Sequence, residues 1–295
     1  MLNKQDQALI ERERLIPGLR YLLQPADLRK LILSKVDIKD PGELKPGYLR
    51  YKPGMNCIAR FEFSADGEQY FAYAKAFGRN AGTKLEKAQE QAQCASPIGP
   101  GRIILQTEQI MFCVFPNDSK LRSLGRLGDD EARQNLFSRL FKSRRGWENP
   151  VITPLNYKPE RRYVAKITGS NGNAAVLKFY ADVEFDQLRM FRKRLQDPPG
   201  VKIPEWIGGS KSHNAVALAW IDGSSLSTSI DSPSLDALHE TGRAIAHFHA
   251  SSQPGLRRRR RHPEAKSLMN LAEQLGFLLP DIEREARILA RKLAP

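Results

Sequence analysis

Residues 157–180 read Tyr-Lys-Pro-Glu-Arg-Arg-Tyr-Val-Ala-Lys-Ile-Thr-Gly-Ser-Asn-Gly-Asn-Ala-Ala-Val-Leu-Lys-Phe-Tyr, and the rest of the chain can be interpreted outward from them. Segments 161–168 and 174–180 are rich in β-branched and aromatic residues, which favour strands. The Asn-Gly pair at 171–172 suits a tight turn that requires positive φ. The stretch therefore predicts a β-hairpin.

Lys178 lies in the middle of the second predicted strand of this hairpin. Because side chains alternate along a strand, Lys178 is predicted on the face opposite Leu177 and Phe179. An unpaired ammonium group among apolar neighbours costs free energy. We therefore expect Lys178 to have an anionic partner.

A predicted helix follows the hairpin at once, from Asp182 to Leu195, with Glu184 and Asp186 in its first turn. Its apolar positions are Phe185, Leu188, Met190 and Phe191. Farther along the chain, a predicted strand ends in Trp-Ile-Asp-Gly at 220–223. A hairpin, a lysine-bearing strand, an acidic helix and a further strand follow one another in this order in the N-terminal lobe of a kinase.

Residues 156–295 resemble the aminoglycoside phosphotransferases and their relatives, the choline, fructosamine and maltose kinases. The resemblance rests on the Lys178 strand and on three later segments in the same order. These are Pro-Glu-Trp-Ile-Gly at 204–208, Trp-Ile-Asp-Gly-Ser-Ser-Leu at 220–226 and Gly-Arg-Ala-Ile-Ala-His-Phe-His at 242–249. The resemblance implies an α+β fold of the protein-kinase-like type, with ATP and Mg²⁺ as cofactors.

The resemblance also implies roles for individual residues. In that family a strand lysine, here Lys178, holds the α- and β-phosphates of ATP. It pairs with a glutamate of the following helix, for which Glu184 is the candidate. The backbone of the hinge, here Ala219, Trp220 and Ile221, would receive the adenine.

An earlier part of the chain repeats the hairpin pattern. Residues 49–61 resemble residues 155–167 at an offset of 106 (155 − 49), with Tyr-Lys-Pro at the same place. Lys75 matches Lys178 at an offset of 103 (178 − 75), and a helical segment, 83–92, follows it. The pattern predicts two tandem N-lobe-like antiparallel units. The alternative is two unrelated hairpins that share Tyr-Lys-Pro by chance.

These patterns divide the chain into five predicted parts. They are a helical leader (1–45), a first N-lobe-like unit (46–120), a basic helical linker (121–150), a second, ATP-binding N-lobe (151–226) and the first helices of a C-lobe (227–295). We expect Lys75 to be a relic or a regulatory contact. The first unit could cap the cleft or present the acceptor substrate.

In the predicted C-lobe, Ser-Pro at 232–233 starts a helix whose apolar positions we expect to face a core. They are Leu235, Leu238, Ile245 and Phe248. His247 and His249 lie two residues apart on this helix and point about 200° from each other, so we do not expect them to share a metal ion.

Composition sets the broad class of the protein. Hydrophobic residues make up 41% and charged residues 27% of 295 residues, as in ordinary globular proteins. No run of 18 apolar residues occurs and the N-terminus lacks the apolar core of a signal peptide, so we expect a cytoplasmic protein without membrane partners. The three cysteines are widely spaced and are expected to be reduced thiols.

The net charge of +14 favours acidic partners, such as nucleic acid or phosphorylated small molecules. Five consecutive arginines, 257–261, form the densest basic run. A solvated loop and a nucleic-acid contact are both open readings of this run. No aromatic residues are interleaved with it, which argues against a platform that stacks single-stranded bases.

A phosphotransferase needs a carboxylate for the attacking hydroxyl and another acid for magnesium. In the resembling family they come from a His-x-Asp loop and a later Asp, and none of the five histidines here is part of a His-x-Asp sequence. We therefore assign no catalytic and no metal-binding residue. We expect an ATP-dependent phosphotransferase acting on a hydroxyl of an unidentified small molecule, inactive as this chain stands and active in a longer form. The alternative is a catalytically silent kinase-like scaffold that binds nucleic acid or a protein through basic surfaces.

Overall fold

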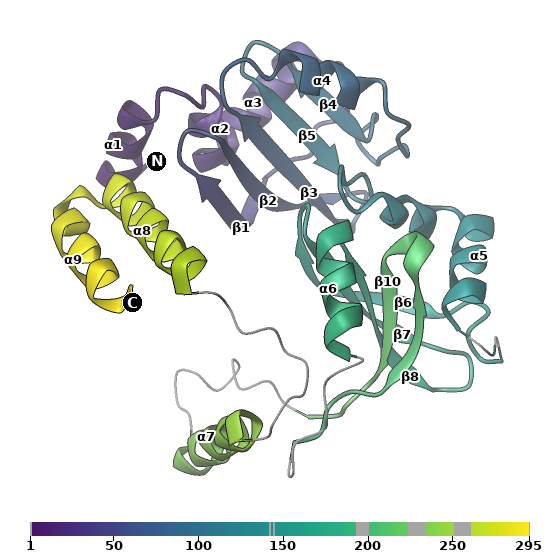
Figure 1. The fold of residues 1–295 in the computed structure, drawn as a ribbon. Coiled ribbons are helices and arrows are strands. Elements are labelled where there is room, and N and C mark those ends of the chain that lie inside the picture. Colours follow the sequence, from purple (N-terminus) through teal and green to yellow (C-terminus); the bar gives the residue numbers. More distant parts are fainter. Residues whose placement is uncertain are drawn as a thin grey trace. The chain divides into compact units, whose positions relative to one another are not determined.

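The computed structural model describes residues 2–141, 143, 145–192, 201–223, 234–250 and 261–294, without the side chains of residues 191, 192, 261 and 262. The chain divides into two compact units, Met1–Ser119 with Arg258–Pro295, and Lys120–Arg257. Each unit is built on a five-stranded antiparallel sheet (Figure 1). No helix within the described ranges is long and apolar enough to cross a membrane.

The first sheet has the order β1-β2-β3-β5-β4. Its strands are β1 (Lys45–Lys52), β2 (Asn56–Ala65), β3 (Glu68–Phe77), β4 (Arg102–Leu105) and β5 (Ile110–Val114). The helices of this unit are α1 (Lys4–Arg12), α2 (Leu19–Leu23), α3 (Pro25–Lys35), α4 (Gly82–Gln89), α8 (Arg261–Leu278) and α9 (Glu283–Leu293), with the short η4 (Pro280–Ile282) before α9.

The second sheet has the order β6-β7-β8-β10-β9. Its strands are β6 (Val151–Lys158), β7 (Arg162–Thr168), β8 (Ala174–Tyr180), β9 (Trp206–Ser210) and β10 (Ala215–Ala219). The helices of this unit are η1 (Arg122–Gly128), α5 (Asp130–Leu140), α6 (Asp182–Arg192), η2 (Lys211–His213) and α7 (Leu235–Ala250).

A helical layer and one sheet face form the core of the first unit. Alternate residues of β2, among them Phe61 and Phe63, pack in one cluster with Leu28 and Ile32 of α3. Leu28 and Ile32 lie four residues apart and therefore share one side of the helix. The core of this unit thus lies between α3 and one face of its sheet (Figure 1).

The second unit buries one sheet face in the same way. Leu177 and Phe179 of β8 are fully buried, and α5 contacts β9 and β10. A Cβ built on Gly208 of β9 would lie 1.9 Å from the carbonyl oxygen of Leu140 at the end of α5. Only a glycine lets the helix approach the strand backbone this closely.

The two sheets agree in register as well as in strand order. Lys75 is the partner of Ile58 on β2, and Lys178 is the partner of Val164 on β7. Ile58 and Val164 lie 106 residues apart (164 − 58), which is the offset of the sequence repeat. The predicted tandem of antiparallel sheets is therefore confirmed, with both lysines at the same position of the third strand.

The turn before the last strand is also equivalent in the two units. Gln109 has φ 54° and Asn214 has φ 49°, and the two lie 105 residues apart (214 − 109). The backbone N–H of Phe77 donates to the carbonyl of Gln109 at 2.9 Å, and that of Tyr180 to the carbonyl of Asn214 at 3.0 Å. The same backbone geometry is thus built twice from different side chains.

The predicted leader and linker contain equivalent elements. The 11-residue helix α3 precedes the first sheet, and the 11-residue helix α5 precedes the second. Each buries two residues four positions apart, Leu28 and Ile32 in α3 and Leu136 and Leu140 in α5. The repeat therefore includes a covering helix as well as the sheet.

Edge strands β1 and β6 also match. Each pairs on one side only, and each carries a proline and a register shift, between Pro46 and Tyr48 in β1 and between Pro154 and Asn156 in β6. Proline and bulges at an edge prevent further strands from adding to a sheet. The exposed edges are thus protected in both copies.

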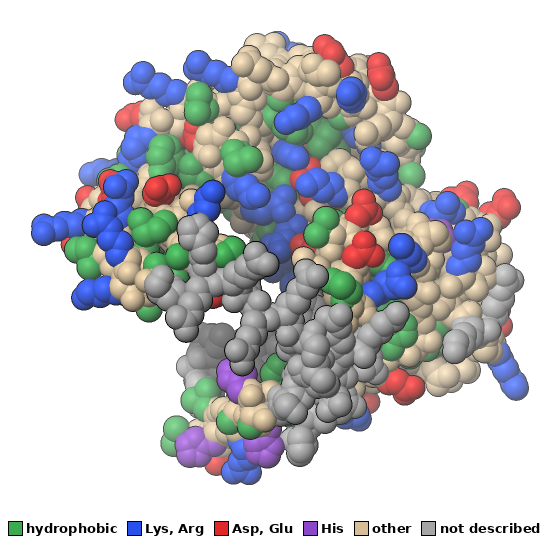
Figure 2. All heavy atoms as spheres, in the orientation of Figure 1, with side chains coloured by type: hydrophobic (Ala, Val, Ile, Leu, Met, Phe, Trp, Pro, Cys, Tyr) green, Lys and Arg blue, Asp and Glu red, His purple; other side chains and the backbone are tan. Residues whose placement is uncertain are grey.

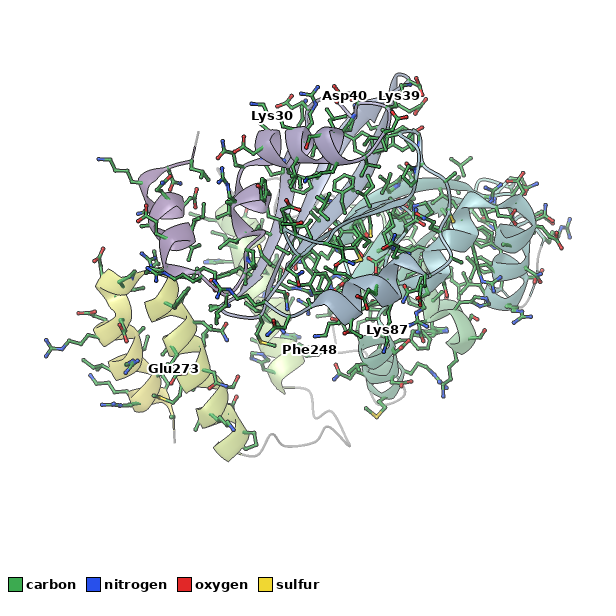
Figure 3. All side chains as sticks on the ribbon, turned by 90° about the horizontal axis from the view of Figure 1, so that it is seen from above. Lys30, Lys39, Asp40, Lys87, Phe248 and Glu273 are labelled. Carbon is green, nitrogen blue, oxygen red and sulfur yellow. The ribbon has the colours of Figure 1, made fainter. Side chains whose placement is uncertain are left out.

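The predicted core face of α7 is not formed. Leu235, Leu238, Ile245 and Phe248 are all exposed (Phe248 is labelled in Figure 3), so the prediction that they face a core is wrong. Of the apolar positions named for the helix after Lys178, Phe185 is buried, whereas Met190 is exposed. Periodicity finds an apolar stripe but cannot say whether another element covers it.

Several predicted features lie outside the described residues. They are the end of the helix after Lys178 (193–195), the end of the hinge segment (224–226), the start of the C-lobe helix (232–233) and most of the arginine run (257–260).

Candidate functional site

Lys178 occupies the middle of the second sheet. Its cross-strand partners are Val164 on β7 and Val216 on β10, and its side chain is half-buried. Leu177 and Phe179 lie on the opposite, fully buried face, so the predicted alternation is confirmed. The lysine is therefore held on a central strand and is not at an edge.

Two further cations share the face of Lys178. Arg162 and Lys166 are two residues on either side of Val164, the partner of Lys178, and residues two apart in a strand point to the same side. Arg162 pairs with Tyr180 in the sheet. We call the surface formed by Arg162, Lys166, Lys178 and Tyr180 the Lys178 face.

The electrostatic setting of Lys178 disfavours its charge. Burial lowers the pKa of the Lys178 ammonium, and the positive charge of Arg162 lowers this pKa further. No carboxylate of the described residues forms an ion pair with Lys178. The anionic partner expected for Lys178 is thus not supplied by the described part of the protein, and an anion bound at this face would favour the charged ammonium and offset both effects on its pKa.

Glu184 is bound elsewhere on the same surface. Arg161 Nε donates to Glu184 Oε1 at 3.0 Å, so the pair between Glu184 and Lys178 implied by the family resemblance is not formed here. Helix α6 begins at Asp182, so its first turn stays near the end of β8. Arg161 lies in the β6–β7 turn at the same end of the sheet, because the next residue, Arg162, pairs with Tyr180 at the end of β8. Lys178 is two residues, or about 7 Å, back along the strand from Tyr180.

The turn between β6 and β7 contains a buried carboxylate. Its residue Glu160 is 3% exposed, has φ 58° and lies 3.9 Å from Lys120 Nζ. The equivalent residue of the first unit is Gly54, with φ 67°. Glu160 thus adopts a backbone conformation that favours glycine and places a carboxylate inside the protein. Its ion pair with Lys120 holds the turn against another segment of the second unit.

The predicted hinge lies at the end of β10, beside the Lys178 face. Lys166 Nζ is 4.4 Å from the ring centroid of Trp220, whose indole N–H donates to Asp222 at 2.8 Å. The backbone N–H of Ala219 donates to the carbonyl of Glu205 at 2.8 Å. The indole ring of Trp220 is thus next to one of the cations of the face.

The backbone groups assigned to adenine differ in how they are used. The N–H groups of Ala219 and Trp220 donate to other backbone carbonyls, whereas no backbone bond of Ile221 is formed within the described residues. Of the three residues that the family resemblance assigns to adenine, Ile221 is therefore the one whose backbone N–H is left for a ligand among the described contacts.

The first unit presents its equivalent face differently. Lys75 Nζ lies 4.7 Å from the ring centroid of Phe77. Arg60, which corresponds to Lys166 at the offset of 106 (166 − 60), forms an ion pair with Glu62 at 2.9 Å. A cation of this first face is thus balanced by a carboxylate, unlike Lys178.

The described residues do not fit a resident Mg²⁺ ion. No group of three or more His, Cys, Asp or Glu side chains among them could hold a metal. Mg²⁺ requires oxygen ligands in near-octahedral geometry, often shared with a nucleotide. We therefore derive no step through a metal.

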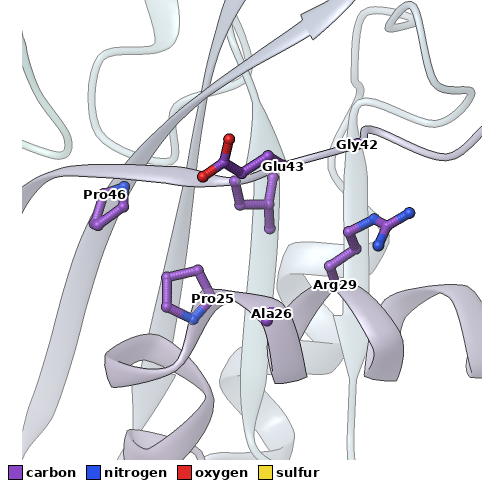
Figure 4. Close-up of a pocket in the computed structure, with 7 residues that line it drawn as sticks. Pro25, Ala26, Arg29, Gly42, Glu43 and Pro46 are labelled. Atoms are coloured by element: carbon purple, nitrogen blue, oxygen red, sulfur yellow. The ribbon is translucent and has the colours of Figure 1, made fainter. Parts of the chain in front are cut away.

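A cavity of about 460 Å³ in the first unit was not foreseen from the sequence (Figure 4). It is lined by Pro25, Ala26, Arg29, Gly42, Glu43, Leu44 and Pro46. Arg29 Nε donates to Asp40 at 2.7 Å, and this bond raises the pKa of Arg29 and lowers that of Asp40. The charge of Arg29 is therefore already paired.

Basic side chains are common on the surface in general. Figure 2 shows lysine and arginine side chains over much of the visible face, with acidic side chains between them, in keeping with the net charge of +14. Net charge alone thus does not distinguish one site, and the unbalanced cations of the Lys178 face carry more information.

No family model, curated protein or solved structure matches this chain.

Proposed function

We propose that the second unit binds the phosphate groups of ATP on the Lys178 face, as the nucleotide-binding lobe of a kinase-like phosphotransferase. The observation that carries the proposal is the unbalanced charge of Lys178, which burial and Arg162 both disfavour. A phosphate oxygen next to the ammonium would form a charge-assisted hydrogen bond and offset the repulsion from Arg162.

The order of elements supports the kinase-like part of the proposal. In protein kinases the phosphate-binding lysine lies on the third strand and the following helix carries its glutamate partner. Lys178 lies on the third strand of its sheet, and α6 follows two residues after that strand ends. Glu184, now paired with Arg161, would have to exchange partners to orient Lys178.

The position of the hinge supports a nucleotide over a bare phosphate. Ala219 is the cross-strand partner of Ala175, three residues before Lys178 and about 10 Å away along the strand. A ligand with its phosphates at Lys178 could therefore extend its base toward Trp220 and Ile221. This separation suits a molecule that carries a flat base at one end and phosphates at the other.

In a complete phosphotransferase of this kind, a substrate hydroxyl oxygen bonds to the γ-phosphorus, the bond to ADP breaks and a carboxylate takes the hydroxyl proton. We assign that carboxylate to no residue of this chain. The proposed role of the described residues is thus to bind and orient ATP, and the small-molecule acceptor stays unassigned.

The net charge of +14 favours a second candidate, a silent scaffold that binds nucleic acid. Such binding weakens steeply with salt, because phosphate contacts release counterions. Binding of ATP by one half-buried lysine and a hinge depends less on salt, since partly buried charges are screened less.

The experiment is a calorimetric titration of the protein with Mg-ATP, followed by competition with tripolyphosphate and with adenosine. We expect saturable binding of one ATP, displaced by tripolyphosphate because the phosphates make the principal contacts. Absence of Mg-ATP binding, together with salt-sensitive binding of DNA or RNA, would favour the scaffold.

A further inference from the structure

The two helices α8 and α9 of the first unit carry large apolar side chains that are exposed to solvent. They are Leu271, Leu279, Ile282, Leu289 and Leu293. Leu289 is 57% exposed and Leu293 is 59% exposed, so the last turns of α9 gain little from the burial of these side chains. Exposed apolar side chains that gather on one surface mark a site of interaction.

Small residues bring α8 and α9 together. Ala272 of α8 and Ala290 of α9 are buried. A Cβ built on Gly276 would lie 2.5 Å from Cγ of Glu283, so α9 passes close to α8 at this glycine. The short η4 connects the two helices, which contact each other and run antiparallel as a helical hairpin (Figure 1).

Helix geometry places the exposed side chains on one side of this hairpin. In each helix, the apolar stripe lies about a quarter of a turn around the axis from the small residues, in the same sense of rotation. Because the two helices run antiparallel, the same rotation turns both stripes to the same side. We call the surface formed by Leu271, Leu279, Ile282, Leu289 and Leu293 the α8–α9 face.

The spacing along α9 is typical of a helix that packs against another helix. Its apolar positions follow one another at intervals of four, three and four residues, the heptad spacing of coiled coils. They are Ile282, Ala286, Leu289 and Leu293. Glu285 and Lys292 flank this stripe on the side away from α8, and within the described residues neither forms an ion pair. The stripe is thus bordered by one acid and one base that are both available to a partner.

The charge of the hairpin indicates the kind of partner. Residues 263–294 contain five acidic and five basic side chains and carry no net charge, although the whole chain carries +14. A helix that binds an anionic membrane surface is instead rich in lysine and arginine on its polar side. A neutral surface that carries both signs suits a partner with the same pattern of charges.

We propose that the α8–α9 face is a self-association surface, on which two copies of this chain pack their hairpins into a four-helix bundle. A two-fold axis perpendicular to the helices makes α9 antiparallel to α9 of the second copy. Ile282 then packs against Leu293 of the second copy, and the small Ala286 lies opposite the larger Leu289. The apolar side chains that are exposed in one copy are thereby buried in the pair.

The same register also pairs the flanking charges. Glu285 and Lys292 are the residues directly before Ala286 and Leu293, so Glu285 of one copy lies beside Lys292 of the second copy. The two-fold symmetry forms this ion pair twice. The proposal uses no residue of the Lys178 face and therefore does not rest on ATP binding.

Sedimentation of the full chain over a range of concentrations tests the association. We expect a concentration-dependent increase from 33.3 kDa to twice that mass. Leu289→Ala should raise the dissociation constant of the dimer about 100-fold, because two apolar side chains lose their burial. Leu289 is exposed in the single chain, so the variant should keep the circular dichroism spectrum of the unaltered protein. A chain that stays monomeric at about 100 μM, or a dimer that Leu289→Ala leaves unchanged, would overturn the proposal.

Charge-swap variants test the register of the two hairpins. Glu285→Lys and Lys292→Glu should each weaken the dimer roughly tenfold at low salt, because each variant places like charges beside one another twice. The double variant Glu285→Lys/Lys292→Glu should recover the dimer, since it restores opposite charges.

Glu273→Lys is the matched control for Glu285→Lys. Glu273 is exposed and lies about 160° around α8 from the apolar stripe (labelled in Figure 3), so the same change of charge there should leave the dimer intact. Equal weakening by the control, or no recovery in the double variant, would overturn the proposed register. Binding of anionic vesicles by a chain that stays monomeric would assign the α8–α9 face to a membrane surface instead.

Discussion

The substitution Glu13→Gln tests how the first unit holds its β1–β2 turn. Glu13 is 5% exposed and follows α1 directly. Its carboxylate accepts from the N–H of Leu15 at 3.0 Å, and from the hydroxyl of Tyr51 at 2.6 Å and the N–H of Gly54 at 2.7 Å. Burial and this carboxylate raise the pKa of Tyr51. One side chain thus ties α1 to the turn that carries Gly54.

The magnitude follows from these three bonds. A glutamine has one acceptor oxygen, so its amide nitrogen must face the N–H of either Leu15 or Gly54, and neither can accept a hydrogen bond. One buried N–H then loses its partner, at about 1–3 kcal/mol, and the remaining bonds lose their charge assistance. The free energy of unfolding of the first unit should fall by about 2–4 kcal/mol, which corresponds to roughly 5–15 °C in Tm.

The assay exploits the distribution of tryptophans. Trp147, Trp206 and Trp220 all lie in the second unit, so their fluorescence reports that unit, whereas far-UV circular dichroism reports both. Glu13→Gln should lower the Tm of a circular dichroism transition without an equal shift in fluorescence. The control is Glu11→Gln, because Glu11 is exposed and bonds only Gln7, at 3.5 Å, within the described contacts. Equal circular dichroism midpoints for the two variants would refute the reasoning.

Three further predictions concern the second unit and the thiols. Gly208→Ala should destabilise the second unit by about 1–3 kcal/mol, measured by urea unfolding with tryptophan fluorescence, because its Cβ would lie 1.9 Å from a backbone oxygen. Only Cys94 should react with a thiol reagent in the native protein, since the other two thiols are buried. Stability of the ligand-free second unit should rise with pH toward 10.5, the ordinary pKa of lysine, because the folded state binds the Lys178 proton less tightly than the unfolded chain. Lys178→Met should remove that pH dependence from the urea midpoints.

Each of these predictions has a control variant or an outcome that would contradict it. Gly242→Ala, with no atom within 4 Å of its new Cβ, should not destabilise α7, so similar losses at Gly208 and Gly242 would contradict the packing argument. Burial raises the pKa of Cys57 and of Cys113 to about 12, so labelling of more than one thiol before unfolding would contradict the structure. An unchanged pH dependence in Lys178→Met would show that another group causes it.

Local patterns were enough to predict much of the fold. The alternation of side chains along 174–180 predicted on which face of the sheet Lys178 lies, because successive side chains of any strand point to opposite faces. The repeated Tyr-Lys-Pro and the two lysines gave the tandem sheets, because equivalent residues keep equivalent register. These features depend only on residues close together in the sequence.

Features that depend on distant segments were not predictable in the same way. The contact of Glu184 with Arg161 depends on where α6 begins relative to the β6–β7 turn. The sequence spacing between Lys178 and Glu184 does not predict this position. The close approach of Leu140, at the end of α5, to Gly208 of β9 joins residues that share no local period. Glu160 stands among Lys158, Arg161 and Arg162 in the sequence, where a surface turn would be expected, yet its carboxylate is buried.

The most direct test of the central claim compares Lys178→Met with Lys75→Met in calorimetric titrations with Mg-ATP. Both lysines occupy the same register position in the two sheets, so the pair controls for charge and strand position. Loss of one charge-assisted bond of about 1.5–3 kcal/mol should weaken ATP binding roughly 10- to 100-fold in Lys178→Met, while Lys75→Met keeps the affinity of the unaltered protein. Unchanged affinity in Lys178→Met, or an equal loss in Lys75→Met, would contradict the assignment of the Lys178 face as the ATP site.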